Sequence, residues 1–172
     1  TFLSFIIITN KGSLIIKKII LFIIISISFS KDHIAVIAFK AIGIEKTDAR
    51  ALTQRVTSEL IKVDEYIVLE RSQIKKILKE QKFQSSGACS DISCAVEVGK
   101  VVGAKYVVLG TVSKFGNTYT LDARLVDVES SVSVRSGDYT TSRAIDNLLL
   151  QGVESIVKQL IGDYSDNEVI NR

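Results

Sequence analysis

The sequence lacks most of the residues that carry catalysis and metal binding. Its 172 residues include one histidine, two cysteines and no methionine. Phosphate-binding and nucleophile motifs of the G-x-x-x-x-G-K-[ST], G-x-G-x-x-G and G-x-S-x-G types are absent. The histidine, His33, stands at the start of a short apolar run, and we interpret it as a surface residue rather than a ligand. We therefore expect no catalytic site, no metal site and no cofactor.

Acidic residues are missing from the first 30 positions. That stretch holds Lys11, Lys17 and Lys18 and no aspartate or glutamate. Since the chain has 22 basic and 19 acidic residues, positions 31–172 carry 19 of each and no net charge. An electroneutral body provides no basic patch for a phosphate backbone. We expect no nucleic-acid partner and, with the catalytic motifs absent, no small-molecule substrate.

The longest apolar run is short. It extends from Ile19 to Phe29 after Lys17-Lys18, and as a helix it would span about 16 Å against a hydrocarbon core of roughly 30 Å. Ser28 and Ser30 provide a small-x-small cleavage site. A basic pair, a short apolar run and such a site are typical of a secretory signal peptide.

The leader sets the boundaries that we expect along the chain. An uncleaved anchor that also uses Phe2 to Ile8 is the alternative to a cleaved signal peptide. Because the chain has no methionine, Leu14 is a candidate start, and the signal peptide would then begin at about residue 14. We predict a leader over 1–30, a single domain over 31–162 and a polar tail over 163–172, with export to the periplasm.

Export permits disulfide formation. The two cysteines, Cys89 and Cys94, lie close together in GACSDISC. An oxidising compartment favours a bridge between them. Two free thiols are the alternative. A zinc site would need four ligands, and the single histidine lies far away in the sequence.

The spacing of the apolar residues predicts an α/β domain. Short apolar runs indicate buried strands, and spacings of three and four indicate amphipathic helices. The predicted strands are 33–39, 66–70, 105–115, 118–128 and 132–139, and the predicted helices are 48–63, one capped by Ser72, 92–102 and 144–161. We expect a mixed sheet of about five strands packed by about four helices. Two N-terminal strands linked by helices precede an antiparallel meander.

Charged residues in two of these elements are candidates for function. Asp122 and Asp127 differ by an odd number of strand positions and so point to opposite faces, which argues against a pair of catalytic carboxylates. Arg124 shares a face with Asp122, and we interpret it as an ion-pair partner. The helix after Ser72 carries several lysines with acidic residues interleaved, at positions 75, 76, 79 and 80. We interpret these lysines as a solvated face rather than a binding surface.

Four segments follow one another in a characteristic order. They are IAVIAF at 34–39, LERSQIKKILKEQ at 69–81, AVEVGKVVGAKYVVLGTVSKFG at 95–116 and YTLDARLVDVES at 119–130. In this order and spacing the body resembles the CsgG-like superfamily of bacterial envelope proteins. That superfamily includes the curli secretion component, the penicillin-binding-protein activator LpoB and a domain at the start of TolB. The match covers nearly all of 34–161.

This resemblance implies a non-catalytic role in the cell envelope. It implies docking on a protein partner, either a secretion or surface-assembly component or a penicillin-binding protein. Self-association is the alternative, since the curli relative is a ring. The leader ends in Ser30 where a lipoprotein has cysteine, so lipidation is not expected. Ala38 stands where the superfamily often has proline, a change that we expect to leave the first strand intact.

The polar stretch from Lys82 to Asp91 is the most irregular part of the body. Loops on a rigid scaffold commonly carry partner contacts. We predict that a partner binds this loop, through Phe83, Gln84, Ser85, Ser86 and Asp91. For Phe83 the alternative is a core position beneath its own loop. A ring-former would instead expose apolar residues on helix flanks or edge strands.

Overall fold

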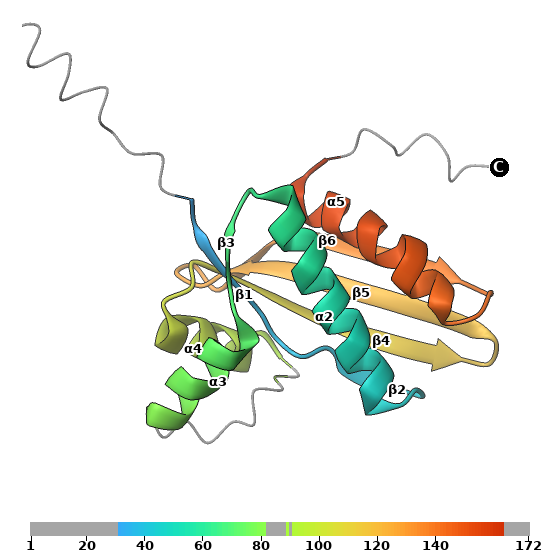
Figure 1. Cartoon of the computed structure of the whole chain (residues 1–172), viewed down its shortest axis with the longest axis horizontal. Helices are drawn as coiled ribbons and strands as arrows, with labels where there is room; N and C mark the ends of the chain where they lie inside the picture. Colours follow the sequence, from blue (N-terminus) through green and yellow to red (C-terminus); the bar gives the residue numbers. More distant parts are fainter. Residues whose placement is uncertain (1–30, 82–88, 90, 164–172) are drawn as a thin grey trace, which may run out of the picture. The chain divides into compact units, whose positions relative to one another are not determined.

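The structure is a computed structural model that describes residues 31–81, 89 and 91–163 (Figure 1). Among these residues six strands form one mixed sheet in the order β3-β1-β4-β5-β6, with β2 also paired to β4. The strands are β1 His33–Val36, β2 Lys40–Ile42, β3 Ile67–Leu69, β4 Tyr106–Phe115, β5 Thr118–Asp127 and β6 Val132–Thr141. The first three pair in parallel, and the last three form an antiparallel meander. The predicted α/β class and meander are confirmed.

The predicted first strand is divided in two. β1 ends at Val36 and β2 begins at Lys40. Between them the backbone N–H of Phe39 donates to Thr53 Oγ1 at 3.0 Å, and that hydroxyl donates to the carbonyl of Ala49 at 2.6 Å. The prediction of one intact strand over 33–39 is therefore wrong, because a helix side chain takes the hydrogen bond of Phe39. This break explains six strands where about five were expected.

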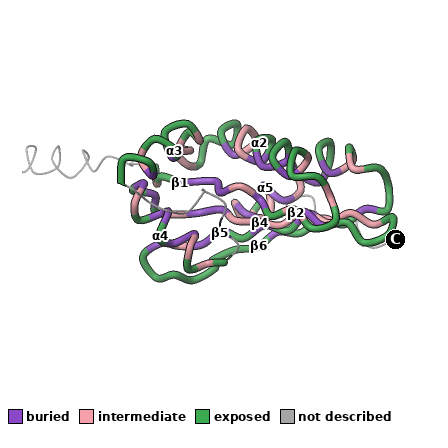
Figure 2. Tube along the Cα trace, turned by 90° about the horizontal axis from the view of Figure 1, so that it is seen from below, coloured by how far each residue is buried: buried purple, intermediate pink, exposed green. Residues whose placement is uncertain are grey.

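The helices pack on both faces of the sheet. Their bounds are α2 Lys46–Val63, α3 Arg71–Glu80, α4 Ile92–Val102, the π-helical turn η2 Leu148–Gly152 and α5 Val153–Ile161. Figure 1 shows α2 and α5 lying across one face, with α3 and α4 together at one end of the sheet. Figure 2 shows that the buried parts of the trace lie between these layers.

Two hydrophobic cores hold the layers together. The first joins α2 and α5 to the sheet through Leu52, Val56, Leu121 and Ile156, among others. The second joins α3 and α4 to the opposite face through residues that include Ala35, Leu78, Val98, Val107 and Val126. Burial of apolar area on both faces of β1 and of the first half of β4 explains why residues 34–36 and 106–109 are apolar.

Some helix ends differ from the predictions. Glu70 is the N-cap of α3, so Ser72 lies within the first turn and does not cap the helix. The last helix was predicted over 144–161, but its first part is replaced by η2. At the end of this turn Gly152 lies close to Tyr139, since a Cβ there would stand 2.9 Å from Tyr139 Cδ1.

Strand β5 has the predicted alternation. Leu121, Ala123 and Leu125 are buried, whereas Asp122 and Arg124 are exposed. The predicted ion pair between Asp122 and Arg124 is not formed in the described part of the chain, and the Asp122 carboxylate accepts from the Thr120 hydroxyl at 3.3 Å. Residues i and i+2 on one face of a strand, such as Asp122 and Arg124, stand about 6.6 Å apart. An exposed ion pair gives too little free energy to hold the long arginine side chain back along the strand.

Candidate functional site: a basic cleft beside the first strands

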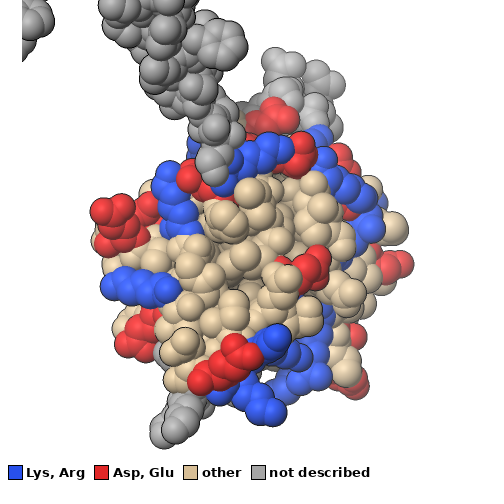
Figure 3. Space-filling model, turned by 60° about the vertical axis from the view of Figure 1, so that its left-hand side comes forward, with Lys and Arg blue, Asp and Glu red and all other residues tan. Residues whose placement is uncertain are grey.

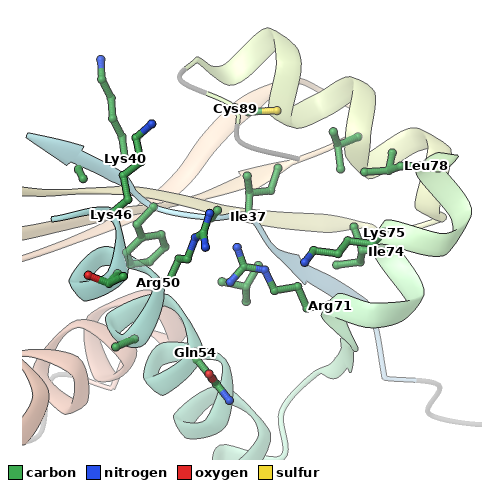
Figure 4. Close-up of a pocket in the computed structure, with 17 residues that line it drawn as sticks. Ile37, Lys40, Lys46, Arg50, Gln54, Arg71, Ile74, Lys75, Leu78 and Cys89 are labelled. Atoms are coloured by element: carbon green, nitrogen blue, oxygen red, sulfur yellow. The ribbon is translucent and has the colours of Figure 1, made fainter. Parts of the chain in front are cut away.

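A cleft of about 810 Å³ lies between the N-terminal half of α2, the segment that links β1 to β2, and α3 (Figure 4). Its floor is apolar and includes Ile37, Phe39, Ile74, Leu78 and Val98. The break after β1 shapes this floor, because Phe39 turns toward α2 to reach Thr53. The volume falls in the roughly 300–1,000 Å³ range of ligand pockets.

The charged residues that line the cleft all have the same sign. They are Lys40, Lys46, Arg50, Arg71 and Lys75, and no described lining residue is acidic. None of the five forms an ion pair within the described part of the chain. Figure 4 shows Arg50, Arg71 and Lys75 gathered toward the middle of the cleft, with Lys40 and Lys46 at one end. The cleft therefore concentrates positive charge on a body with no net charge.

Elsewhere on the described surface several basic residues have an acidic partner. Lys105 Nζ lies 2.7 Å from the carboxylate of Asp32, and Glu59 receives both Arg55 and Lys62 at 2.9 and 2.8 Å. Figure 3 shows one face of the molecule on which basic and acidic side chains are interspersed around an uncharged centre. The cleft differs from this face because its charged lining residues are all basic.

Arg50 and Arg71 are the cations that interact most directly. Burial lowers the pKa of the Arg71 guanidinium, and the positive charge of Arg50 lowers it further. The Arg71 guanidinium keeps its charge at neutral pH, because arginine side chains are not deprotonated in proteins. A planar guanidinium fork matches a carboxylate or phosphate group with two parallel hydrogen bonds. The pair is therefore preorganised to receive an anion.

The cleft can bind but carries no catalytic set among its described residues. Its uncharged polar lining consists of Thr47 and Gln54, and no histidine or carboxylate faces it. Within the described ranges no three histidine, cysteine, aspartate or glutamate side chains come together as a metal site. Positive charge, hydrogen-bond donors and an apolar floor suit the recognition of an anionic group.

The predicted loop meets this cleft at its C-terminal end. Cys89 lines the cleft, and its sulfur lies 2.06 Å from that of Cys94, at bonding distance. Asp91 is the N-cap of α4, where its carboxylate accepts from the backbone N–H of Cys94 at 2.9 Å. The other four predicted contact residues, Phe83, Gln84, Ser85 and Ser86, lie outside the described residues. His33 is exposed, as expected.

Sequence reasoning missed the cleft. The lysines of α3 were assigned to a solvated face, which suits Lys76, whose ammonium group lies 4.0 Å from the Glu80 carboxylate, but Lys75 lines the cleft. A signal was present in the sequence. Lys46 and Arg50 are spaced i,i+4 on one helix and Arg71 and Lys75 on the next, although like charges at this spacing destabilise a helix.

A further finding concerns the membrane. Across the part of the chain that the structure describes, the helices are too short or too polar for any of them to cross a bilayer.

Comparison with known proteins identifies relatives. A family model described as the curli production assembly/transport component CsgG matches residues 23–123. The C-terminal domain of LpoB from Escherichia coli aligns with a TM-score of 0.55 at 18% identity, over 69% of this chain and 87% of its own. Lipoprotein GNA1162 from Neisseria meningitidis aligns with a TM-score of 0.55 at 18% identity, over 77% of this chain and 99% of its own. At this identity the structures share the fold. No curated protein matches the sequence.

Proposed function

This chain belongs to the family of the curli production assembly/transport component CsgG, and we propose that it is an exported, non-catalytic docking domain of the bacterial cell envelope. The observation that carries the proposal is the basic cleft, which is built for recognition and lies in a fold of envelope assembly components. In this proposal the leader over 1–30, with a signal peptide from about residue 14, directs the chain to the periplasm.

The partner is an envelope protein, either a secretion or surface-assembly component or a penicillin-binding protein. It contacts the loop that contains Phe83, Gln84, Ser85 and Ser86. The position of Cys89 in the cleft lining and of Asp91 at the start of α4 supports this placement, because the C-terminal end of the loop then borders the cleft.

Cross-linking in intact envelopes tests the proposal. The full chain with a C-terminal tag is captured after cross-linking, and the proteins that accompany it are identified by mass spectrometry. We expect one envelope protein at defined stoichiometry, and we expect Phe83→Ala to reduce its recovery with an unchanged melting temperature. Recovery of the bait alone from both proteins contradicts docking. A large loss of melting temperature for Phe83→Ala would assign that ring to the core.

Self-association is a second candidate function, and the edge strands favour it. β6 lies at one edge of the sheet with Val132 and Val134 exposed by 55% and 47%, and β3 lies at the other edge with Ile67 exposed by 43%. Exposed apolar edge strands are templates for pairing with another chain. Pairing of β6 with β3 of a second copy would be head-to-tail, the arrangement that generates rings.

The molar mass in solution distinguishes the two functions. Light scattering coupled to gel filtration gives a monomer if the chain only docks on partners and a multiple of 18.9 kDa, less the leader, if it forms a ring. In a ring-former, Val132→Lys combined with Val134→Lys yields monomers. Gln73→Lys, an exposed polar position on α3 and not on an edge strand, is the control for the added charge.

A further inference from the structure

The strand beside the cleft has a free edge. β2 pairs with β4, in the register Lys40 to Thr111 through Ile42 to Ser113, and with no other described strand. On that side of the sheet β3 covers β1, where it pairs with residues 33–35, and does not extend along β2. Lys40 and Ala41 line the cleft. The cleft therefore runs beside a strand with one edge unpaired among the described strands.

The positive charge of the cleft exceeds what protection of this edge requires. A lysine on an edge strand commonly discourages pairing with other chains, and Lys40 fits that role. Three other cations, Arg50, Arg71 and Lys75, come from two helices. Protection of the strand edge does not explain why they converge. The apolar floor beneath them and the absence of an ion pair to any of them within the described residues point to a ligand with several negative charges.

We propose that the cleft binds an extended acidic peptide segment of a partner protein, which adds a strand to the free edge of β2 and directs its carboxylates to Arg50, Arg71 and the three lysines. The proposal rests on the docking function and specifies its chemistry. Strand addition gives affinity through backbone hydrogen bonds, and every second side chain of the added strand faces the same way. An acidic residue at alternate positions therefore brings successive carboxylates to the cations.

Two observations favour a peptide over an anionic lipid headgroup. The cations extend along the cleft from Lys40 and Lys46 at one end to the Arg50, Arg71 and Lys75 group, whereas one headgroup phosphate reaches only neighbouring cations (Figure 4). The free edge of β2 provides backbone donors and acceptors that a peptide backbone matches along its length. A nucleic acid is disfavoured because the body has no net charge over which to spread phosphate contacts.

Binding of defined peptides tests the proposal on protein purified from the envelope. The probe is a blocked ten-residue peptide that alternates glutamate and threonine, and the control is the same peptide with glutamine in place of glutamate. We expect the acidic peptide to bind at least about tenfold more tightly, since charge-assisted hydrogen bonds to the two arginines are lost in the control. Equal binding of the two peptides overturns the proposal. Binding to phosphatidylglycerol vesicles that the acidic peptide does not displace also overturns it and assigns the cleft to lipid.

Variants locate the binding within the cleft. Arg50→Gln combined with Arg71→Gln weakens the acidic peptide by about tenfold or more, and the corresponding lysine variants restore part of the loss because they keep the charge without the fork. Arg55→Gln is the matched control, since Arg55 lies on the same helix, outside the cleft, and pairs with Glu59. An equal loss in the control and the cleft variants contradicts the proposal. Melting curves of all variants exclude unfolding as the cause.

Amide exchange tests the added strand. With the acidic peptide bound, the backbone amides of Lys40–Ile42 exchange more slowly, and a peptide N-methylated at alternate residues binds more weakly. Exchange that is unchanged at β2, together with full binding of the N-methylated peptide, overturns strand addition.

The outcomes separate this inference from the proposed function. If the variant with both arginines changed to glutamine still captures an envelope protein, the docking function stands and the cleft has no part in it. If the acidic peptide binds as expected but no partner is captured from envelopes, the cleft binds acidic peptides and the docking function is contradicted.

Discussion

Arg50 and Arg71 meet in the cleft without an acidic partner among the described residues, and this placement has a cost in the free protein. The pKa of Arg71 is lowered by burial and by the charge of Arg50, which means that the folded state disfavours the two charges together. Sites preorganised for a ligand commonly retain such unfavourable interactions.

We therefore predict that Arg50→Gln stabilises the free protein while it weakens binding. At low ionic strength the free energy of unfolding rises by about 0.3–1 kcal/mol, the range for an exposed or half-buried charge interaction, and 1 M salt removes most of the gain by screening. Chemical unfolding at both ionic strengths measures the effect. Arg55→Gln, which removes the pair with Glu59, changes stability in the opposite direction or not at all. A loss of stability in Arg50→Gln at low salt would show that the guanidinium is not repelled in the fold.

Asp127 organises the turn between β5 and β6. Its carboxylate accepts from the backbone N–H of Ser130 at 2.8 Å and from the Ser130 hydroxyl at 2.7 Å, and these bonds lower its pKa. A carboxyl whose pKa is lowered in the folded state stabilises the fold above its unfolded value of about 3.9, and loses that contribution as pH falls through the folded pKa.

The prediction for Asp127→Asn follows from this sign. The variant melts at a lower temperature than the parent at pH 7. The difference shrinks as pH falls from about 4 through the lowered pKa of Asp127, below which both chains carry a neutral side chain. Melting curves from pH 7 to pH 2.5 check it. A difference that is the same at pH 7 and pH 2.5 would mean that the carboxylate charge has no part in the turn.

At the scale of elements, local pattern predicted most of the structure. The helices around Leu52 and Val98 follow from the spacing of apolar residues, and the hairpin at Gly116 follows from a residue that favours a turn. Both signals lie within a few residues of the sequence. The break at Phe39 and the close approach at Gly152 depend on partners, Thr53 and Tyr139, that are 14 and 13 residues away in the sequence and meet them only in the folded state. Neighbouring residues carry no signal for such contacts.

Gly99 tests how closely α4 approaches the sheet. A Cβ at this position would stand 2.6 Å from Val128 Cγ2 and 2.7 Å from Val107 Cγ2, both buried in the second core. We predict that Gly99→Ala lowers the free energy of unfolding by about 1–3 kcal/mol, as overpacking of a close contact does. Denaturant titration measures it, with the exposed neighbour variant Lys100→Ala as a control expected within about 0.5 kcal/mol of the parent. Equal stability of the parent and Gly99→Ala would show that α4 has room to move away from β4 and β5.

The segment before α4 provides the second prediction for an element. If Cys89 and Cys94 are joined in the exported protein, native protein does not react with a thiol reagent until a reductant is added. The double variant Cys89→Ser with Cys94→Ser then has a free energy of unfolding lower by up to about 2 kcal/mol, the chain-entropy value for so short a loop. Full alkylation of the unreduced protein contradicts the disulfide.

At the scale of the whole molecule, composition predicted a body with no net charge and gave no indication of the local positive charge in the cleft. Acidic residues such as Glu45, Asp48 and Glu70 stand near the basic residues of α2 and α3 in the sequence, and over the whole body the two signs balance. Folding places the cations of three elements on one cleft and leaves those acids outside its lining. The family could be predicted from the order of the elements, because that order is a property of the entire chain. The site could not, because it is made by the segregation of charge in space.

Site-specific photo-cross-linking in living cells tests the central claim most directly. A photoreactive residue replaces Lys75 in the cleft or Ser136 on β6, the strand at the sheet edge farthest from β3 in the strand order. If the protein is a docking domain, position 75 cross-links to one other envelope protein. The yield of this product falls in the double variant Arg50→Gln with Arg71→Gln, and position 136 gives no defined product. Cross-links from position 136 in multiples of the chain's own mass, with none from position 75, would contradict the account and assign the protein to self-assembly.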